Sequence, residues 1–68
     1  MSVQVKLNGE PRELPDGATV AEAVTELTAA ATGVAAAVNG DVVPRGSWTV
    51  TFLRDGDQVE VVTAVQGG

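Results

Sequence analysis

Apolar and polar residues alternate at the start of the chain. Val3–Leu7 has valine or leucine at every second position, which predicts a half-buried strand. Asn8 and Gly9 follow, and this pair is the strongest two-residue signal for a β-hairpin because both residues accept a positive φ. Glu10–Leu14 is then expected to return as a second strand. Pro11 has no amide hydrogen to donate, so we expect this strand at an edge of the sheet.

The apolar spacing changes to that of a helix after a turn at residues 15–17. Thr19 and Glu22 have the pattern of a capping box, in which each side chain accepts a hydrogen bond from the other residue's backbone amide. Apolar residues then recur at helical spacing on one face, at Val20, Val24, Leu27 and Ala31. We expect the helix to end near Gly33, because glycine readily takes the left-handed conformation that ends many helices.

The second half of the chain predicts short strands separated by turns. Val34–Val38 is a short apolar run between turn residues, which favours a strand over a helix. Asn39-Gly40 repeats the hairpin signal, and residues 42–43 are expected to form a short return strand. After a tight turn at Asp55-Gly56-Asp57, the apolar run in Gln58–Val65 predicts the last strand.

The segment Arg45–Leu53 has no clear period, so we expect irregular structure there. Trp48 and Phe52 are the aromatic residues of the chain, and both fall in this segment. We expect both rings to be buried and to hold the segment in place, with Trp48 packing rather than anchoring a partner. Arg45 can form a local contact or reach a partner, and the pattern does not decide between them.

This order of elements predicts an α+β domain. A single helix after the first hairpin has to cover one face of the sheet, since no other element is long enough to do so. The pattern is that of a β-grasp (ubiquitin-like) fold, in which a mixed four- to five-stranded sheet packs on one helix. The first and last strands would then pair in parallel at the centre of the sheet. We expect residues 1–66 to form this domain and residues 67–68 to form a flexible di-glycine tail.

The composition excludes most kinds of catalysis and points to protein partners. The chain has neither cysteine nor histidine, so it offers no Cys–His or Ser–His pair and no ordinary zinc site. We therefore expect a protein that is not an enzyme and binds no metal. The net charge is −5, which favours docking on a basic patch of another protein. The basic residues are scattered and predict no nucleic-acid binding: Lys6, Arg12, Arg45 and Arg54.

The chain has no apolar run of membrane-spanning length and no secretory signal at its N-terminus. We therefore expect a soluble, cytoplasmic protein that does not bind membranes.

The last residues carry the candidate chemistry. Gly67 and Gly68 have no side chains, so they can enter a channel that any other residue would block. The α-carboxylate of Gly68 is ionised and is a poor electrophile at neutral pH, and this chain has no group with which to activate it. We therefore expect another protein to modify Gly68. Val62 and Ala64 make the second face of the last strand more apolar than a solvated surface needs. The predicted partner-binding residues are Val62, Ala64, Gln66, Gly67 and Gly68.

Several short motifs together resemble one family along nearly the whole chain. They are Asn8-Gly9, Thr19-Val20, Ala37-Val38-Asn39, Val43-Pro44-Arg45 with Trp48, Asp55-Gly56-Asp57 and the ending Ala64-Val65-Gln66-Gly67-Gly68. In order and spacing they resemble the ThiS family, the sulfur carrier proteins of thiamine-thiazole biosynthesis. An alanine-rich segment after the helix departs mildly from the family pattern, and the C-terminal ending is intact.

The resemblance implies a carrier that other proteins modify. A ThiF-like adenylating enzyme would use ATP to convert the Gly68 carboxylate to an acyl-adenylate, so the carrier itself would bind no cofactor. Sulfur from a cysteine-persulfide donor would then replace AMP and leave a C-terminal thiocarboxylate. Thiazole synthase would accept this sulfur.

Three other functions stay open at this point. A carrier for another pathway, such as the small subunit of molybdopterin synthase, shares the fold and the Gly-Gly ending. That family usually has a longer chain and an aromatic-proline approach to the ending, where this chain has residues 63–66 as Thr-Ala-Val-Gln. A ubiquitin-like modifier would form amide bonds with lysines. A plain β-grasp binding module would leave its terminus idle.

Overall fold

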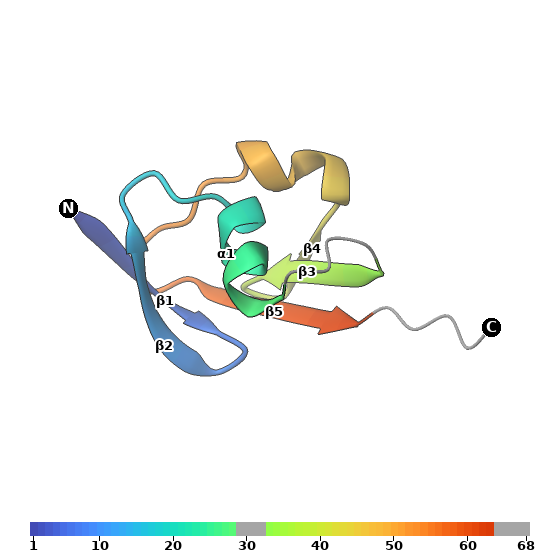
Figure 1. Ribbon diagram of the computed structural model, residues 1–68, viewed down its shortest axis with the longest axis horizontal. Helices are drawn as coiled ribbons and strands as arrows, with labels where there is room; N and C mark the ends of the chain where they lie inside the picture. The colour runs from blue at the N-terminus through green and yellow to red at the C-terminus, as the bar shows by residue number, and fades with distance from the viewer. Residues whose placement is uncertain (29–32, 64–68) are drawn as a thin grey trace.

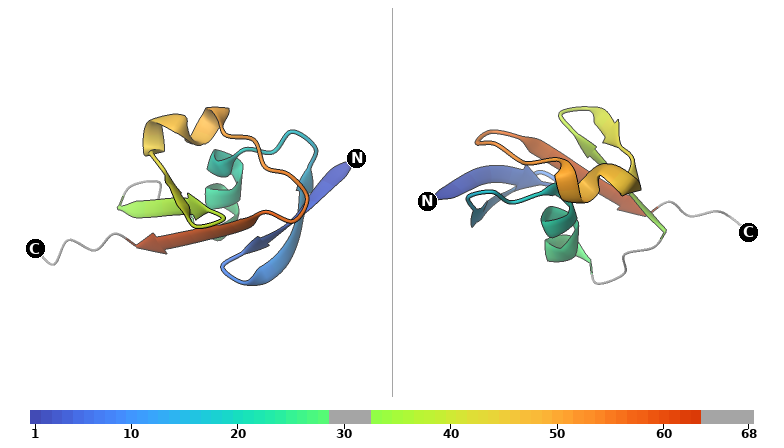
Figure 2. Two further views of the ribbon diagram at one scale, coloured as in Figure 1. Left: turned by 180° about the vertical axis from the view of Figure 1, so that it is seen from behind. Right: turned by 90° about the horizontal axis from the view of Figure 1, so that it is seen from above.

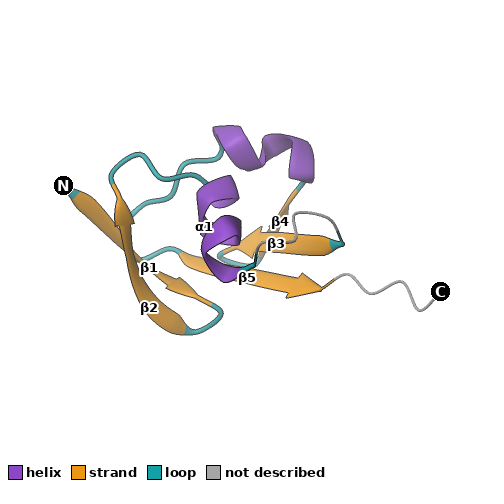
Figure 3. Ribbon diagram, viewed as in Figure 1, coloured by secondary structure: helices purple, strands orange, loops and turns teal. Residues whose placement is uncertain are grey.

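A computed structural model describes residues 1–28 and 33–63 of the chain. Within these residues, five strands form a single sheet and one α-helix crosses one of its faces (Figure 1). A short 3-10 helix, η1, lies close to α1, as the views in Figure 2 and the colouring in Figure 3 show. The elements are β1 (Ser2–Leu7), β2 (Glu10–Pro15), α1 (Val20–Leu27), β3 (Val34–Val38), β4 (Asp41–Val43), η1 (Arg45–Val50) and β5 (Gln58–Thr63).

The strand order β2-β1-β5-β3-β4 confirms the predicted β-grasp arrangement. The first and last strands pair in parallel, with Lys6 opposite Gln58 and Leu7 opposite Val59. β3 pairs with the other side of β5 in the antiparallel direction, and β4 and β2 form the edges. The edge position of β2 is the one that Pro11 predicted. β5 is therefore the central strand, held between β1 and β3.

Both Asn-Gly pairs form the hairpin turns that the sequence predicts. Asn8 and Asn39 each have a φ of 52°, and the glycines that follow have φ values of 86° and 89°. Two successive residues with positive φ are the mark of a type I′ turn, whose twist matches that of the flanking strands. The first turn joins β1 to β2, and the second joins β3 to β4.

The inner face of the sheet packs against α1 and carries the core. Alternate residues of β1 and β5 are buried, as expected for strands with one covered face. Leu7, Val20 and Val59 are the largest side chains that are completely covered. The other buried apolar residues are Val3, Val5, Leu14, Ala18, Ala23, Val24, Ala36, Trp48, Leu53 and Val61. Burial of one valine or leucine contributes about 1.5–3 kcal/mol, so this single layer stabilises the domain.

α1 leaves the outer face of the sheet open. A near-continuous apolar run such as that of β5 is typical of strands that are buried on both faces. In β5, however, only Val59 and Val61 are buried, whereas Val62 is 60% exposed. On the same outer face, Val42 of β4 is 74% exposed. One helix can cover only one face, and the second face therefore keeps apolar residues in contact with solvent.

The helix is shorter than its sequence predicts. The capping box forms as expected: the Glu22 amide donates to Thr19 Oγ1 at 3.4 Å, and the Thr19 amide donates to Glu22 Oε1 at 3.0 Å. The expected end near Gly33 is wrong, because α1 ends at Leu27 and Thr28 is already extended. Thr28 is the C-cap of the helix, and its amide donates the closing hydrogen bond to the Val24 carbonyl at 2.9 Å. Ala31, which was expected on the helix, lies outside the described residues.

The segment between β4 and β5 also corrects two expectations. Residues Arg45–Val50 form a regular 3-10 helix rather than an irregular loop. Trp48 is buried as predicted, but Phe52 is 63% exposed. Thr51 is extended and Phe52 forms an antiparallel bridge with Thr19, beside which the Leu53 amide donates to the Ala18 carbonyl at 2.9 Å. Neighbouring side chains of an extended segment point in opposite directions, so burial of Leu53 turns the phenylalanine ring outward.

Candidate functional site

The candidate site begins at the carboxyl end of the central strand. β5 ends at Thr63, and the residues that follow it in the sequence carry the predicted chemistry. Of the predicted partner-binding residues, Val62 is described, and it lies on the open face of the sheet with 60% of its surface exposed. The others lie outside the described residues: Ala64, Gln66, Gly67 and Gly68.

Val62 belongs to an apolar patch that three strands assemble. It lies opposite Ala35 of β3, and Ala37 of the same strand lies opposite Val42 of β4. The four residues line one hollow, together with Ala36 and Glu60. We call Ala35, Ala37, Val42 and Val62 the outer patch. An exposed apolar surface of this kind, next to a charged residue, is typical of a protein-binding site.

Sequence reasoning identified only one member of the outer patch. Val34–Val38 is apolar throughout, so its pattern does not reveal which residues face outward. The signal that could have found the two alanines is the hairpin register, because an Asn-Gly turn at positions 39–40 sets Val42 opposite Ala37. The position of Val62 beside them depends on the pairing of β3 with β5, which is a long-range contact.

The two hairpin asparagines hold the central strand as well as forming turns. Oδ1 of Asn39 accepts a hydrogen bond from the Gln58 amide at 3.0 Å, at the start of β5. Oδ1 of Asn8 accepts one from the Val61 amide at 2.8 Å, and its Nδ2 donates to the Val61 carbonyl at 3.1 Å, near the end of β5. Sequence reasoning assigned both asparagines to turns alone and missed these contacts.

The carboxylates of the turn at residues 55–57 have structural roles. Asp55 Oδ1 accepts a hydrogen bond from the Gln4 amide at 2.7 Å. Asp57 accepts one from the Arg54 amide at 2.8 Å and one from Nδ2 of Asn39 at 2.9 Å. These contacts confirm the turn. In residues 1–28 and 33–63, no group of three acidic side chains lies close enough together to hold a metal ion.

Arg45 and Trp48 interact with each other and with the backbone. Nε1 of Trp48 donates to the Val43 carbonyl at 2.9 Å, so the polar edge of the buried ring is satisfied. The Arg45 guanidinium lies 5.8 Å from the centre of the indole ring, within the range of a cation–π contact. These contacts confirm that Trp48 packs inside the fold, and they give Arg45 a local partner.

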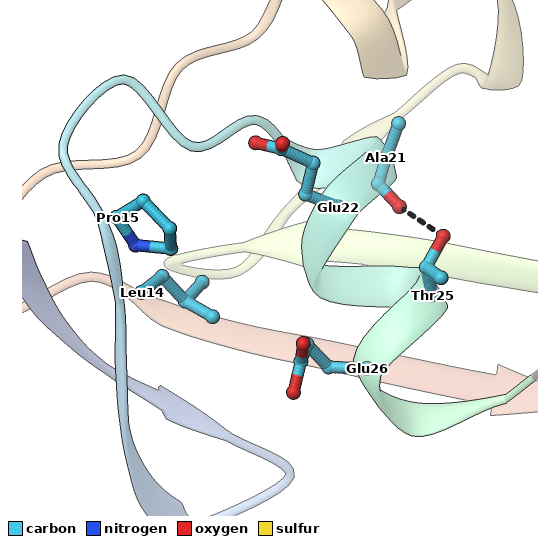
Figure 4. Close-up of a pocket in the computed structure, with 6 residues that line it drawn as sticks. All are labelled: Leu14, Pro15, Ala21, Glu22, Thr25 and Glu26. Atoms are coloured by element: carbon cyan, nitrogen blue, oxygen red, sulfur yellow. Dashed lines mark hydrogen bonds between the residues drawn. The ribbon is translucent and has the colours of Figure 1, made fainter.

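A hollow between β2 and α1 has polar groups that are already in use (Figure 4). Its acidic residues are Glu22, which caps the helix, and Glu26, whose Oε1 lies 3.1 Å from Nη1 of Arg12. The Thr25 hydroxyl donates to the Ala21 carbonyl at 3.0 Å, the contact drawn as a dashed line in Figure 4. The hollow therefore lacks a converging set of free polar groups for a ligand.

The fold and the open sheet face define a class of protein, the small ubiquitin-like β-grasp domains. A helix long and apolar enough to cross a bilayer is not present in the described ranges. Comparison with known sequences narrows the class: the sequence model of the ThiS family matches residues 5–68. The chain belongs to the ThiS family.

Individual relatives agree with this assignment. The chain is 32% identical to the sulfur carrier protein ThiS of Escherichia coli, over 97% of this chain and 100% of that protein. It is 44% identical to the sulfur carrier protein ThiS of Thermus thermophilus, over 94% of this chain and 98% of that protein. The crystal structure of the thiamine biosynthesis protein ThiS from Geobacter metallireducens superposes with a TM-score of 0.81 at 30% identity, covering 97% of this chain and 100% of that chain.

The chain is accordingly a sulfur carrier of thiamine-thiazole biosynthesis and not an enzyme. Two larger proteins also contain a similar segment. The thiazole synthases of Magnetococcus marinus and Paramagnetospirillum magneticum are 36% and 32% identical to 97% of this chain, which corresponds to 20% of their own length.

Proposed function

We propose that the Gly68 carboxylate is the group that carries the sulfur. The observation that supports this most directly is the family match, which extends through residue 68. In the proposed reaction, a ThiF-like enzyme and ATP form an acyl-adenylate at Gly68 and release pyrophosphate. The terminal sulfur of a cysteine persulfide attacks the acyl carbon and expels AMP, giving an acyl disulfide. A thiol then attacks the donor cysteine's sulfur in this S–S bond, forms a new disulfide with it and releases the thiocarboxylate. The thiocarboxylate passes its sulfur to thiazole synthase.

The chemistry explains why the carrier needs a partner and why glycines are suited to the end of the chain. An α-carboxylate is a poor electrophile because it is ionised at neutral pH, and adenylation gives it a good leaving group. An active site that binds ATP and this end has to enclose it, and residues without side chains fit a narrow channel. Ordering each residue costs about 1–2 kcal/mol of backbone entropy. Docking of the folded domain has to offset this cost.

We propose that the outer patch provides this docking surface. Val62 and Val42 are the exposed members of the patch, and Val62 is six residues before Gly68 in the sequence. A partner bound there is within reach of the C-terminal residues. Glu60 lies beside the patch, and the chain carries a net charge of −5. The complementary surface is therefore an apolar area with basic residues at its rim.

Thiazole synthase is proposed as the second partner. Two thiazole synthases each contain a segment that is similar to this chain, and this similarity supports the proposal. Joining a carrier and an acceptor in one chain raises their effective concentration without any new contact. A carrier on a separate chain would meet the same acceptor by diffusion. We propose that the cycle runs in the cytoplasm, where ATP is available for the adenylation step.

The experiment that tests the proposal is incubation of the purified chain with ATP and a thiazole-pathway adenylating enzyme. Intact-mass analysis is expected to find AMP on the chain, and a persulfide donor with a reducing thiol is expected to replace one oxygen with sulfur. Fragmentation should place both changes on Gly68. A chain without residues 67–68 is the control and should stay unmodified. Modification of a lysine, or none at all, would contradict the proposal.

A glycine substitution sharpens this test. Gly67→Ala is expected to leave folding intact and to slow adenylation at least about a hundredfold, because a methyl group obstructs the channel and displaces the reacting carbon. Gly46→Ala is the matched control, since a Cβ at this η1 position would meet no atom within 4 Å. ATP–pyrophosphate exchange measures both variants. Normal exchange with Gly67→Ala would exclude a narrow channel.

A further inference from the structure

Asn8 completes the hydrogen bonding of the central strand where β1 stops. β1 pairs with β5 only through Lys6 and Leu7, after which the chain turns into the first hairpin. The backbone amide of Asn8 donates to the Val59 carbonyl at 2.9 Å. Its side-chain amide then takes the place of a further peptide group, accepting from the Val61 amide at 2.8 Å and donating to the Val61 carbonyl at 3.1 Å. Asn8 thus makes the hydrogen bonds to β5 that further residues of β1 would make if the strand continued.

This contact is the last one on its side of β5 in the described ranges. Backbone groups along a strand point alternately to its two neighbours, and those of Val59 and Val61 point toward β1. Thr63 is the last residue of β5 and lies in register with Val34 of β3, and among the described residues no hydrogen bond joins it to Asn8 or to β1. In the described part of the chain, Val61 is therefore the last residue of β5 that is hydrogen-bonded on the β1 side. Gly68 follows it seven residues later in the sequence.

We propose that Asn8 is a positioning residue for the C-terminal end of the carrier. By holding Val61 to the sheet, it sets the direction in which the chain leaves β5 toward Gly68. This inference rests on the proposed function, because its effect is on delivery of the Gly68 carboxylate to the adenylating enzyme. A strand end held from both sides has fewer orientations than one held by β3 alone. A larger share of docked carriers then has the carboxylate in reactive geometry.

The position of Asn8 predicts a particular kinetic effect. Removal of its amide takes away the hydrogen bonds of the Val61 backbone. The pairing of β3 with β4 and β5 stays in place, and with it the outer patch. Docking through this patch should persist, while fewer docked molecules react. The expected change is therefore in kcat rather than in the KM for the carrier.

Asn39 provides a matched control on the same strand. It has the same φ of 52°, and it is also followed by glycine. Its side chain holds the opposite end of β5, through the Gln58 amide at 3.0 Å and Asp57 Oδ1 at 2.9 Å. Glycine at either position keeps the positive φ and removes only the side-chain amide. The two glycine variants thus differ in which end of β5 they release.

The test measures adenylation of the wild-type carrier, Asn8→Gly and Asn39→Gly by the purified ThiF-like enzyme. Asn8→Gly is expected to lower kcat roughly tenfold, with KM for the carrier changed less than about twofold. Asn39→Gly is expected to leave both constants within about twofold of the wild type. The bonds of Asn8 are partly buried and those of Asn39 are exposed, so Asn8→Gly is expected to lose more stability. Urea denaturation identifies conditions in which both variants are fully folded, and kcat is compared there so that a loss of stability does not contribute.

A third variant keeps the test decisive if Asn8→Gly does not fold. Asn8→Asp retains the oxygen that accepts from the Val61 amide but loses the donor to the Val61 carbonyl, so its kcat should lie between wild type and Asn8→Gly. Equal kcat values for the position-8 and position-39 variants, or a change confined to KM, would overturn the positioning role. A wild-type carrier that is not adenylated would overturn the proposed function, and the positioning role with it.

Discussion

The two faces of the sheet place the same residue type in opposite environments. On the inner face, Val59 and Val61 are 0% and 8% exposed and form part of the core. On the outer face, Val62 and Val42 are 60% and 74% exposed. All four are valines, so their chemistry does not distinguish them. Position in the sheet decides that the inner pair stabilises the fold and that the outer pair is available to a partner.

The strongest test of this contrast is a charge on the inner face. Val59→Asp is expected to unfold the chain, because an unpaired carboxylate would replace a completely buried side chain. The loss should exceed about 4 kcal/mol, a large part of the stability of so small a domain. Circular dichroism and urea denaturation measure it. A cooperatively folded variant would mean that the inner face tolerates solvent.

The same substitution on the outer face should separate binding from folding. Val62→Asp is expected to change the free energy of unfolding by less than about 0.5 kcal/mol, because the site is exposed. Its affinity for the adenylating enzyme should fall by about 10- to 100-fold, since the charge enters an apolar interface. Isothermal titration calorimetry measures the affinity.

Val50 of η1 is the matched control for the outer-face test. It is 67% exposed, close to the value for Val62, but it lies outside the outer patch. Val50→Asp should leave affinity unchanged. Equal losses for the two variants would show that the effect comes from added negative charge, and unchanged binding of Val62→Asp would exclude the outer patch as the docking surface.

A substitution at the N-cap of α1 tests whether a loss of folding stability by itself alters the affinity for the adenylating enzyme. Thr19→Ala removes the side-chain acceptor of the Glu22 amide and is expected to destabilise the fold by about 1 kcal/mol. α1 packs on the inner face, so affinity for the adenylating enzyme should stay within about twofold once the protein is folded. Urea denaturation and calorimetry on the same sample check both values. A parallel loss of affinity would mean that the two faces are coupled.

The smallest effect is expected at the ion pair between β2 and the helix. Nη1 of Arg12 lies 3.1 Å from Oε1 of Glu26, and both side chains are well exposed to solvent. Arg12→Ala should lower the free energy of unfolding by no more than about 0.5 kcal/mol, and salt should reduce the difference. Denaturation at low and high ionic strength measures this. A loss above about 1 kcal/mol would indicate that the Arg12 stem packs on the core.

Local signals predicted most of the elements, whereas the helix end near Gly33, the irregular structure after Pro44 and the burial of Phe52 were wrong. The capping box, both hairpins and the edge strand follow from residues close together in sequence, such as Thr19 with Glu22. The burial of Phe52 was predicted from its chemistry alone. Its orientation depends on the hydrogen bond of Leu53 to the distant Ala18 carbonyl, which no local pattern contains.

The candidate site also has one part that is visible in the sequence and another that depends on contacts between distant residues. The Gly67-Gly68 ending is visible in the sequence, and the chemistry proposed for it depends only on its terminal carboxylate and on the lack of side chains. The outer patch could not be predicted in full, since Val62 meets Ala35 only through the pairing of β5 with β3. The hydrogen bonds between the Asn8 side chain and the Val61 backbone could not be predicted either, because these residues are 53 positions apart in the sequence.

The class of fold and the family follow from the residues in order along the chain, and so does the proposal that Gly68 carries the chemistry. Turn geometry, helix capping and the spacing of apolar residues depend on short segments of the chain. The family pattern depends on motifs along the full amino-acid sequence. Only the folded structure shows which valines of the sheet face solvent and which asparagine side chain is hydrogen-bonded to each end of β5. These features arise when strands far apart in sequence come to lie side by side and complete each other's hydrogen bonds.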